Sequence, residues 1–148
     1  MRLRYIFLIS ILLTISAHLS AQNDRQLVRI GNRFFYEQNY AKAEIEYRKA
    51  IASNGGNTQA IYNLGCALQK KDSAAIKQYE LAGKIETNKI RKSKSYHNIG
   101  VICQSHQMYK EAIEAYKESL RNNPGDNETR YNYVLCKRLQ KNQKNQND

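Results

Sequence analysis

The sequence predicts an all-α protein in which three helical hairpins stack side by side and one further helix follows them. Two observations predict this class. The composition suits helices, because proline occurs once in 148 residues while Ala, Glu, Lys, Gln and Asn are frequent. A glycine also recurs in one phase, at Gly31, Gly65 and Gly100, which are 34 and then 35 positions apart. A fixed period of this length indicates a solenoid of repeated units.

The first residues differ chemically from the rest of the chain. Arg2 and Arg4 precede the apolar run Ile6–Ile15, and small and polar residues follow up to Ala21. This is the order of a secretory signal peptide, and the run is about half of the roughly 20 residues that a membrane-spanning helix needs. We expect a signal peptide over residues 1–21, cleaved after Ala21. Cleavage after Ala17 and retention as an uncleaved anchor are the alternatives.

Each repeat is expected to be a pair of antiparallel helices. The first helix carries the glycine, and the second carries small residues around a tyrosine: Ala43, Tyr47 and Ala50, then Ala75, Tyr79 and Ala82, then Ala112, Tyr116 and Ser119. Their spacing places them on one helical face. A glycine inside a helix costs about 1 kcal/mol relative to alanine. We therefore expect the glycines to let the second helix, which carries the small residues, approach closely, and the tyrosines to fill the space between one repeat and the next.

The pattern also sets the limits of the elements. The expected helices are 25–37, 41–53, 58–70, 73–86, 93–105, 109–121 and 127–140. They form a domain over residues 22–140, with repeats over about 24–57, 58–92 and 93–126. Asn39, Asp72 and Asp126 are expected to cap helices.

The last helix has no partner in the sequence, so it is expected to cap the stack. Tyr131, Val134 and Leu135 would then point inward. Residues 141–148 contain only Lys, Asn, Gln and Asp, a composition that predicts a disordered tail.

These features resemble the tetratricopeptide repeat (TPR). That family has large, Leu, Gly and aromatic positions in the first helix, Ala, aromatic and Ala positions in the second, and a closing Pro. The third repeat matches best, with Tyr96, Ile99, Gly100, Tyr109, Ala112, Tyr116, Leu120 and Pro124. The second departs most, with a short turn at Lys71-Asp72 and about three extra residues between Gly83 and Lys92. The predicted fold class is therefore an all-α TPR helix-turn-helix solenoid of three repeats plus a C-terminal capping helix.

A narrower resemblance rests on motifs at both ends of the mature chain. Arg25…Gly31-Asn32-Arg33 opens it, and Arg121-Asn122-Asn123-Pro124-Gly125-Asp126…Thr129-Arg130-Tyr131-Asn132 precedes the polar tail. With an export signal and three units, this is similar to BatC, the small TPR member of the bacterial aerotolerance (Bat) group. The resemblance implies a periplasmic protein, associated with the inner membrane through its partners. Those partners would be membrane-anchored von Willebrand factor A-domain proteins, and the assembly would aid tolerance of oxidative stress.

The first helices of a TPR solenoid line its concave groove, so we expect a protein partner to bind there. An Asn beside an aromatic residue or His recurs in one phase, and such amides could hydrogen-bond an extended peptide backbone while the rings supply apolar area. An ordinary role within the repeats is the alternative. The expected partner-binding residues are Asn32, Tyr36, Tyr62, Asn63, Lys70, Lys94, His97, Asn98, Tyr131 and Asn132, with Val28, Cys66 and Val101 in the same groove.

One TPR subfamily grips the C-terminal carboxylate of a partner with Lys, Asn and Arg side chains. Asn32, Asn63 and Lys94 would fit that pattern. Val28 and Asn98 stand where two of its cations would be, so a charge-assisted carboxylate clamp is not expected.

The formal charge of +11 favours acidic partners or an anionic membrane surface. The strongest local run is Lys84, Lys89, Arg91, Lys92 and Lys94, opposed only by Glu86. It is either a solvated linker or a docking site for acidic loops or anionic headgroups. Nucleic-acid binding is not expected, because no recognised motif accompanies the charge.

The sequence offers no constellation for catalysis, metal binding or a cofactor. Cys66, Cys103 and Cys136 fall in three helices, and we expect them to pack as small apolar residues. Thiol-based redox sensing is a further alternative. No small-molecule substrate is expected. The predicted function is a non-catalytic protein–protein interaction scaffold, with a membrane-anchored structural subunit held by an uncleaved signal as the alternative.

Overall fold

The computed structural model describes residues 23–68 and 72–147, which form helices joined by turns and contain no strand. The predicted all-α class is confirmed. The chain divides into two compact units, of which unit 1 ends at Ala67 and unit 2 begins at Leu68. The predicted signal peptide lies outside the described residues. Among the described helices, none is both long enough and apolar enough to cross a membrane.

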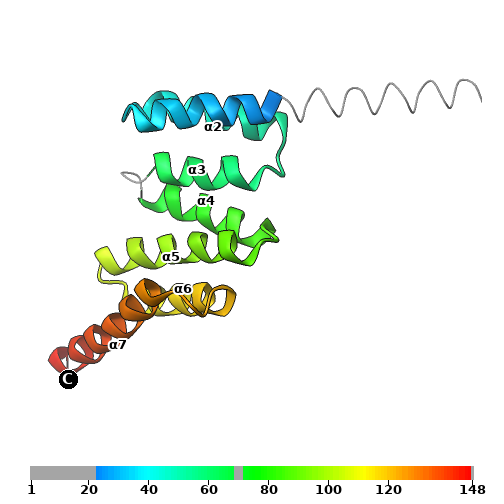
Figure 1. The fold of residues 1–148 in the computed structure, drawn as a ribbon. Helices are drawn as coiled ribbons and strands as arrows, with labels where there is room; N and C mark the ends of the chain where they lie inside the picture. Colours follow the sequence, from blue (N-terminus) through cyan, green and yellow to red (C-terminus); the bar gives the residue numbers. More distant parts are fainter. Residues whose placement is uncertain (1–22, 69–71, 148) are drawn as a thin grey trace, which may run out of the picture. The chain divides into compact units, whose positions relative to one another are not determined.

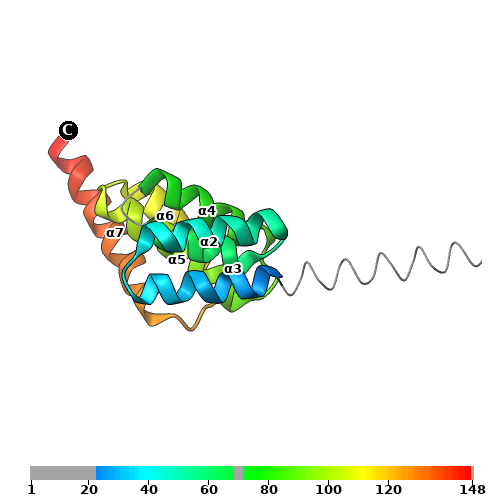
Figure 2. The same cartoon turned by 90° about the horizontal axis from the view of Figure 1, so that it is seen from above.

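Unit 1 contains the first helix, described over residues 23–36, followed by α2 (Tyr40–Ser53) and α3 (Thr58–Ala67). Figure 2 shows the first helix and α2 as an antiparallel pair, and α3 packs against α2. Val28, Ala50 and Ala60 form the buried core between these three helices, and Leu27 and Ile51 pack against it. Two alanines at the centre of this cluster allow the helix backbones to approach closely.

The turn between the paired helices of unit 1 uses a residue in the left-handed conformation. The N–H of Asn39 donates to the carbonyl of Phe34 at 2.8 Å, and the N–H of Gln38 donates to the carbonyl of Phe35 at 3.0 Å. These two bonds form a Schellman motif, in which the penultimate residue has a positive φ, and Gln38 has φ of 58°. Asn39 then caps α2, as predicted, by accepting from the N–H of Lys42.

Unit 2 contains α4 (Asp72–Ile85), α5 (Lys89–Ser105), α6 (Tyr109–Asn122) and α7 (Asn127–Asn147). Each of these helices packs against the next one along the chain (Figure 1). The predicted cap of α7 is confirmed, because the Asp126 carboxylate accepts from the N–H of Thr129 at 2.9 Å. Asp72, the other predicted cap in this unit, is the first residue of α4.

A tyrosine ring, rather than a small side chain, occupies the space above two of the repeated glycines. A methyl group added at Gly31 would lie 2.6 Å from the Tyr47 ring, and one added at Gly100 would lie 2.4 Å from the Tyr116 ring. The sequence predicted a close approach of the second helix at these glycines but did not identify the tyrosine ring as the group that lies on them. Glycine is needed in the first helix because the ring of the second helix lies directly on its backbone.

Helix α5 begins four residues earlier than predicted, inside the run that the sequence presented as a linker. Asn88 caps it by accepting from the N–H of Arg91 at 3.0 Å. The Glu86 carboxylate accepts from the N–H of Asn88 at 2.8 Å and from the Arg91 side chain. These side-chain bonds satisfy the N–H groups of Asn88 and Arg91, which a linker would leave to water.

The last helix differs from its prediction in its length and in which of its faces is buried. It continues to Asn147 instead of ending at residue 140, because residues 141–147 contain no Gly or Pro to stop it. The residues that it buries completely are Thr129 and Cys136. Tyr131 and Val134 were predicted to point inward, but their exposed fractions are 68% and 52%.

The corresponding turn in unit 2 supports a first prediction. Gln107 has φ of 59°, and the bonds from Gln107 and Met108 to the carbonyls of Gln104 and Cys103 repeat the Schellman motif. A non-glycine residue in this conformation is strained. Gln107→Gly should therefore raise the free energy of unfolding by about 0.5 to 1 kcal/mol, measured by urea titration.

A matched substitution provides the control. Gln78 lies inside α4, where glycine is a poor helix former, so Gln78→Gly should lower the free energy of unfolding by about 1 kcal/mol. A loss of stability in both variants would contradict the strain at Gln107.

Candidate partner-binding surfaces

In unit 1, two of the predicted groove asparagines meet. The side-chain Nδ2 of Asn63 donates to Oδ1 of Asn32 at 2.8 Å, and the hydroxyl of Tyr47 donates to the same oxygen at 2.9 Å. Burial, followed by the nearby Cys66 and Tyr36, raises the pKa of Tyr47 well above its usual value, so this hydroxyl stays protonated and keeps donating. The structure therefore holds the two half-buried amides in one fixed orientation on successive first helices.

Aromatic side chains gather at the end of the first helix of unit 1. The largely exposed Tyr36 ring lies edge-on to Phe35 at 6.3 Å between centroids, and Phe35 lies 5.3 Å from Tyr40. Sequence reasoning selected Tyr36 but missed Phe35 and Tyr40. The run Phe34-Phe35-Tyr36 before a helix-capping asparagine was the available signal.

The other predicted groove residues of unit 1 differ in their surroundings. Tyr62 is half-buried and engaged in an interaction. Val28 was predicted to line the groove, but its exposed fraction is 5% and it belongs to the core with Ala50 and Ala60. That prediction was wrong, because this valine packs against the alanines of the two following helices. Lys70 lies outside the described residues.

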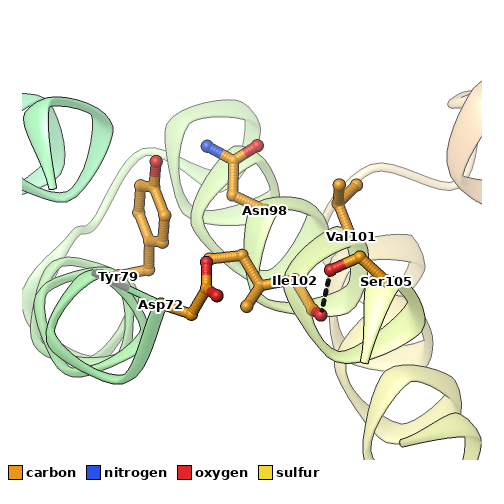
Figure 3. A pocket seen from close by; sticks show the side chains of 6 residues that line it. All are labelled: Asp72, Tyr79, Asn98, Val101, Ile102 and Ser105. Atoms are coloured by element: carbon orange, nitrogen blue, oxygen red, sulfur yellow. Dashed lines mark hydrogen bonds between the residues drawn. The ribbon is translucent and has the colours of Figure 1, made fainter. Parts of the chain in front are cut away.

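Unit 2 carries a hollow of about 290 Å³ between α4 and α5 (Figure 3). Asn98 and Val101, which the sequence assigned to the groove, line it from α5. Sequence reasoning missed the remaining lining residues, which are Asp72, Tyr79, Ile102 and Ser105. The Tyr79 side chain is itself buried. An amide and a carboxylate around an aliphatic surface suit the backbone and an apolar side chain of an extended peptide.

A His–Asp pair stands beside this hollow. Nε2 of His106 lies 2.6 Å from Oδ2 of Asp72, and both side chains are about half exposed. Ser105 directly precedes His106 in the sequence, but its hydroxyl donates to the carbonyl of Ile102 at 2.7 Å. The pair therefore does not activate this serine as a nucleophile, which requires a hydrogen bond between the base and the hydroxyl.

His97 does not line the hollow but contacts α7. Its Nδ1 lies 2.6 Å from the Thr129 hydroxyl, its Nε2 lies 3.7 Å from the Glu128 carboxylate, and its ring lies 5.9 Å from the Tyr116 ring. These contacts assign this histidine to packing between helices. Of the other predicted residues, Lys94 and Tyr131 are exposed and Asn132 is half-buried.

Two of the cysteines, Cys103 and Cys136, are buried, and Cys66 is half-buried. Burial raises the pKa of Cys103, with Glu111 and Glu80 adding to the shift, and burial together with Cys103 raises the pKa of Cys136. The Cys136 thiol donates to the Gln104 side-chain oxygen at 3.2 Å. A raised pKa lowers the thiolate fraction and hence the reactivity. Within residues 23–68 and 72–147, no group of three His, Cys, Asp or Glu side chains is placed to hold a metal ion.

Comparison with known proteins assigns the fold. Residues 93–126, which span α5, α6 and the turn that follows, match the family model of the tetratricopeptide repeat. The first TPR of Spaghetti (RPAP3), bound to the HSP90 peptide SRMEEVD, has a TM-score of 0.71 at 23% identity. The match covers 79% of this chain and 92% of that one. The fold is the TPR fold.

Two further solved structures share the TPR fold. The second TPR domain of human RPAP3, in complex with the HSP70 peptide SGPTIEEVD, has a TM-score of 0.68 at 24% identity, over 81% of this chain and 97% of that one. The N-terminal domain of stress-induced protein-1 from C. elegans has a TM-score of 0.73 at 19% identity, over 82% and 97%. No curated protein is significantly similar in sequence. The TPR fold is typically a protein-interaction module, and no catalytic family is indicated.

Proposed function

We propose that this chain is a non-catalytic TPR scaffold of the bacterial periplasm, similar to BatC, that assembles with membrane-anchored von Willebrand factor A-domain proteins. The assembly would support aerotolerance and resistance to oxidative stress. The observation that carries the binding role is the fixed Asn32–Asn63 pair, two amides aligned on successive first helices. The signal-peptide pattern of residues 1–21 supports export, and the motifs at the two ends of the mature chain support the BatC assignment.

The proposed ligand is an internal, extended segment of the partner. The Asn32–Asn63 pair in unit 1 and the hollow beside Asn98 in unit 2 each offer amide groups next to a tyrosine. The amides hydrogen-bond a peptide backbone of any sequence. The Tyr47 ring is buried, and its hydroxyl holds the Asn32 oxygen in place. Two RPAP3 structures contain peptides that end in EEVD. Here Val28 is buried and Asn98 is uncharged, so a terminal carboxylate would lack two of the cations that clamp it.

The test measures partner affinity after removal of two groove amides. Pull-down from solubilised membranes, followed by mass spectrometry, should enrich von Willebrand factor A-domain proteins. Asn63→Ala with Asn98→Ala should weaken binding of the purified partner by about tenfold or more, because each lost hydrogen bond contributes about 1 kcal/mol. The melting temperature should fall only slightly, because both side chains are only half-buried and the loss of the Asn63–Asn32 hydrogen bond costs about 1 kcal/mol.

A control variant removes two asparagines elsewhere. Asn142→Ala with Asn145→Ala changes two exposed residues near the end of α7 and should leave the affinity unchanged. Equal affinity for the groove variant and the wild type would remove the amide pair from the binding surface. Failure to enrich any von Willebrand factor A-domain protein would contradict the assignment of the partner.

A further inference from the structure

Exposed aliphatic and basic side chains gather where α4 ends and α5 begins. The exposed fractions of Leu81, Ile85 and Ile90 are 43%, 38% and 50%. We define the α4–α5 patch as Leu81, Lys84, Ile85, Lys89, Ile90 and Lys94. The patch is distinct from the hollow, because none of its residues lines that hollow. We propose that it docks the protein on the surface of a lipid bilayer that carries anionic headgroups.

The helical spacing places the apolar and basic members together. Leu81, Lys84 and Ile85 stand three and four positions apart and so share one face of the last turns of α4. Ile90 and Lys94 share a face of α5 in the same way. Bonds from Arg91 to Glu86 join the two sides of the turn. Aliphatic and ammonium groups therefore reach the surface from both helices next to one turn.

The acid within this stretch does not offset the positive charge. Glu86 has an exposed fraction of 6%, and its oxygens accept from the Arg91 guanidinium at 2.8 and 3.1 Å and from the N–H of Asn88. Residues 81–95 hold five Lys and Arg residues and this one acid. Because the Glu86 carboxylate is paired with the Arg91 guanidinium, the net positive charge of this stretch comes from its lysines. The first turn of α5 contains no acidic residue.

The side-chain chemistry favours a bilayer over a protein partner. Lysine is depleted from the cores of protein–protein interfaces, which favour aromatic residues, whereas the aliphatic residues here alternate with lysines. At a membrane surface the lysine stem lies along the apolar boundary while the ammonium stays among the headgroups. Amphipathic segments of this composition bind anionic membranes through the burial of apolar area and through the attraction of their cations to anionic headgroups.

The test compares vesicle binding of full-length variants. The probes are phosphatidylcholine vesicles and vesicles in which part of that lipid is replaced by phosphatidylglycerol. The readout is the increase in cosedimentation when phosphatidylglycerol is present. Any binding through the apolar residues 6–15 is the same in every variant and therefore cancels when the variants are compared. Lys84→Gln, Lys89→Gln and Lys94→Gln together should reduce this gain by about a hundredfold. Ile85→Ser with Ile90→Ser should reduce binding by about tenfold.

A matched control separates the patch from total charge. Arg138→Gln, Lys141→Gln and Lys144→Gln remove three exposed cations from α7 and should leave the gain nearly unchanged. An equal loss in both triple variants would overturn the proposal, because net charge alone would then explain binding. Absence of any gain with phosphatidylglycerol would overturn it too. Self-association that is lost on Ile85→Ser with Ile90→Ser would assign the patch to a second copy. The groove substitutions Asn63→Ala and Asn98→Ala should not affect vesicle binding, so either proposal can fail alone.

Discussion

Tyr116→Ala is expected to lower the free energy of unfolding of unit 2 by about 3 to 5 kcal/mol, the usual cost of truncating a buried aromatic side chain. The Tyr116 side chain is completely buried. Its ring covers the backbone of Gly100 and stands beside the His97 ring, and its hydroxyl donates to Gln104 at 2.8 Å. Truncation leaves a cavity where α5 meets α6. Urea unfolding followed by circular dichroism measures the loss.

Tyr116→Phe provides the comparison. It keeps the ring on Gly100 and removes only the hydroxyl, so it should cost about 1 kcal/mol. The Gln104 oxygen would retain the Cys136 thiol as a donor. If the alanine variant were no less stable than the phenylalanine variant, the ring would not be part of the core.

Gly100→Ala is expected to destabilise unit 2 although alanine is the better helix former. The added methyl group would lie 2.4, 2.5 and 2.8 Å from three carbon atoms of the Tyr116 ring. Overpacking of a well-packed core costs about 1 to 3 kcal/mol. The rigid, buried ring cannot move away without displacing α6, so the cost should exceed the helix-propensity gain of about 1 kcal/mol. We expect a net loss of up to about 2 kcal/mol in the same assay.

Gly125→Ala is the matched control for this substitution. Its added methyl group would be 3.7 Å from the nearest atom, the side-chain oxygen of Asn123, and its backbone does not require glycine. Its stability should change by less than about 0.5 kcal/mol. A Gly100→Ala variant as stable as this control would contradict the close contact between ring and helix.

The helices and their phase could be predicted from the sequence, because repeated glycines and tyrosines report which face of each helix is buried. The side chain that packs on each glycine could not be predicted. Periodicity orients a residue on its helix but does not say how far a side chain of the neighbouring helix reaches. Tyr47 and Tyr116 extend onto Gly31 and Gly100 of their own hairpins.

The errors at the start of α5 and in α7 have a common cause. The start of α5 was missed because Lys89–Lys92 lacks apolar periodicity, while the capping bonds of Asn88 and Glu86 hold that turn. In α7, Tyr131 and Val134 are apolar, yet Thr129 and Cys136 are buried because His97 and Gln104 contact them from α5. Such polar contacts between helices are not visible in the hydrophobic pattern.

The candidate site could be predicted only in part from the sequence. Asn32 and Asn63 could be selected because they recur near the glycine phase, and the structure brings them together. The hollow beside Asn98 also needs Asp72 and Tyr79 from α4, whose distance from α5 no repeat pattern specifies.

The contact between ring and glycine also restricts changes in chain length. Tyr47 follows Gly31 by 16 positions, and Tyr116 follows Gly100 by 16 positions. An inserted or deleted residue in the intervening turn would rotate the second helix by about 100° or displace it along its axis. Either change would move the tyrosine ring away from the glycine. Length variation should therefore be tolerated between successive hairpins, as in the extra residues after Gly83, but not inside these two hairpins.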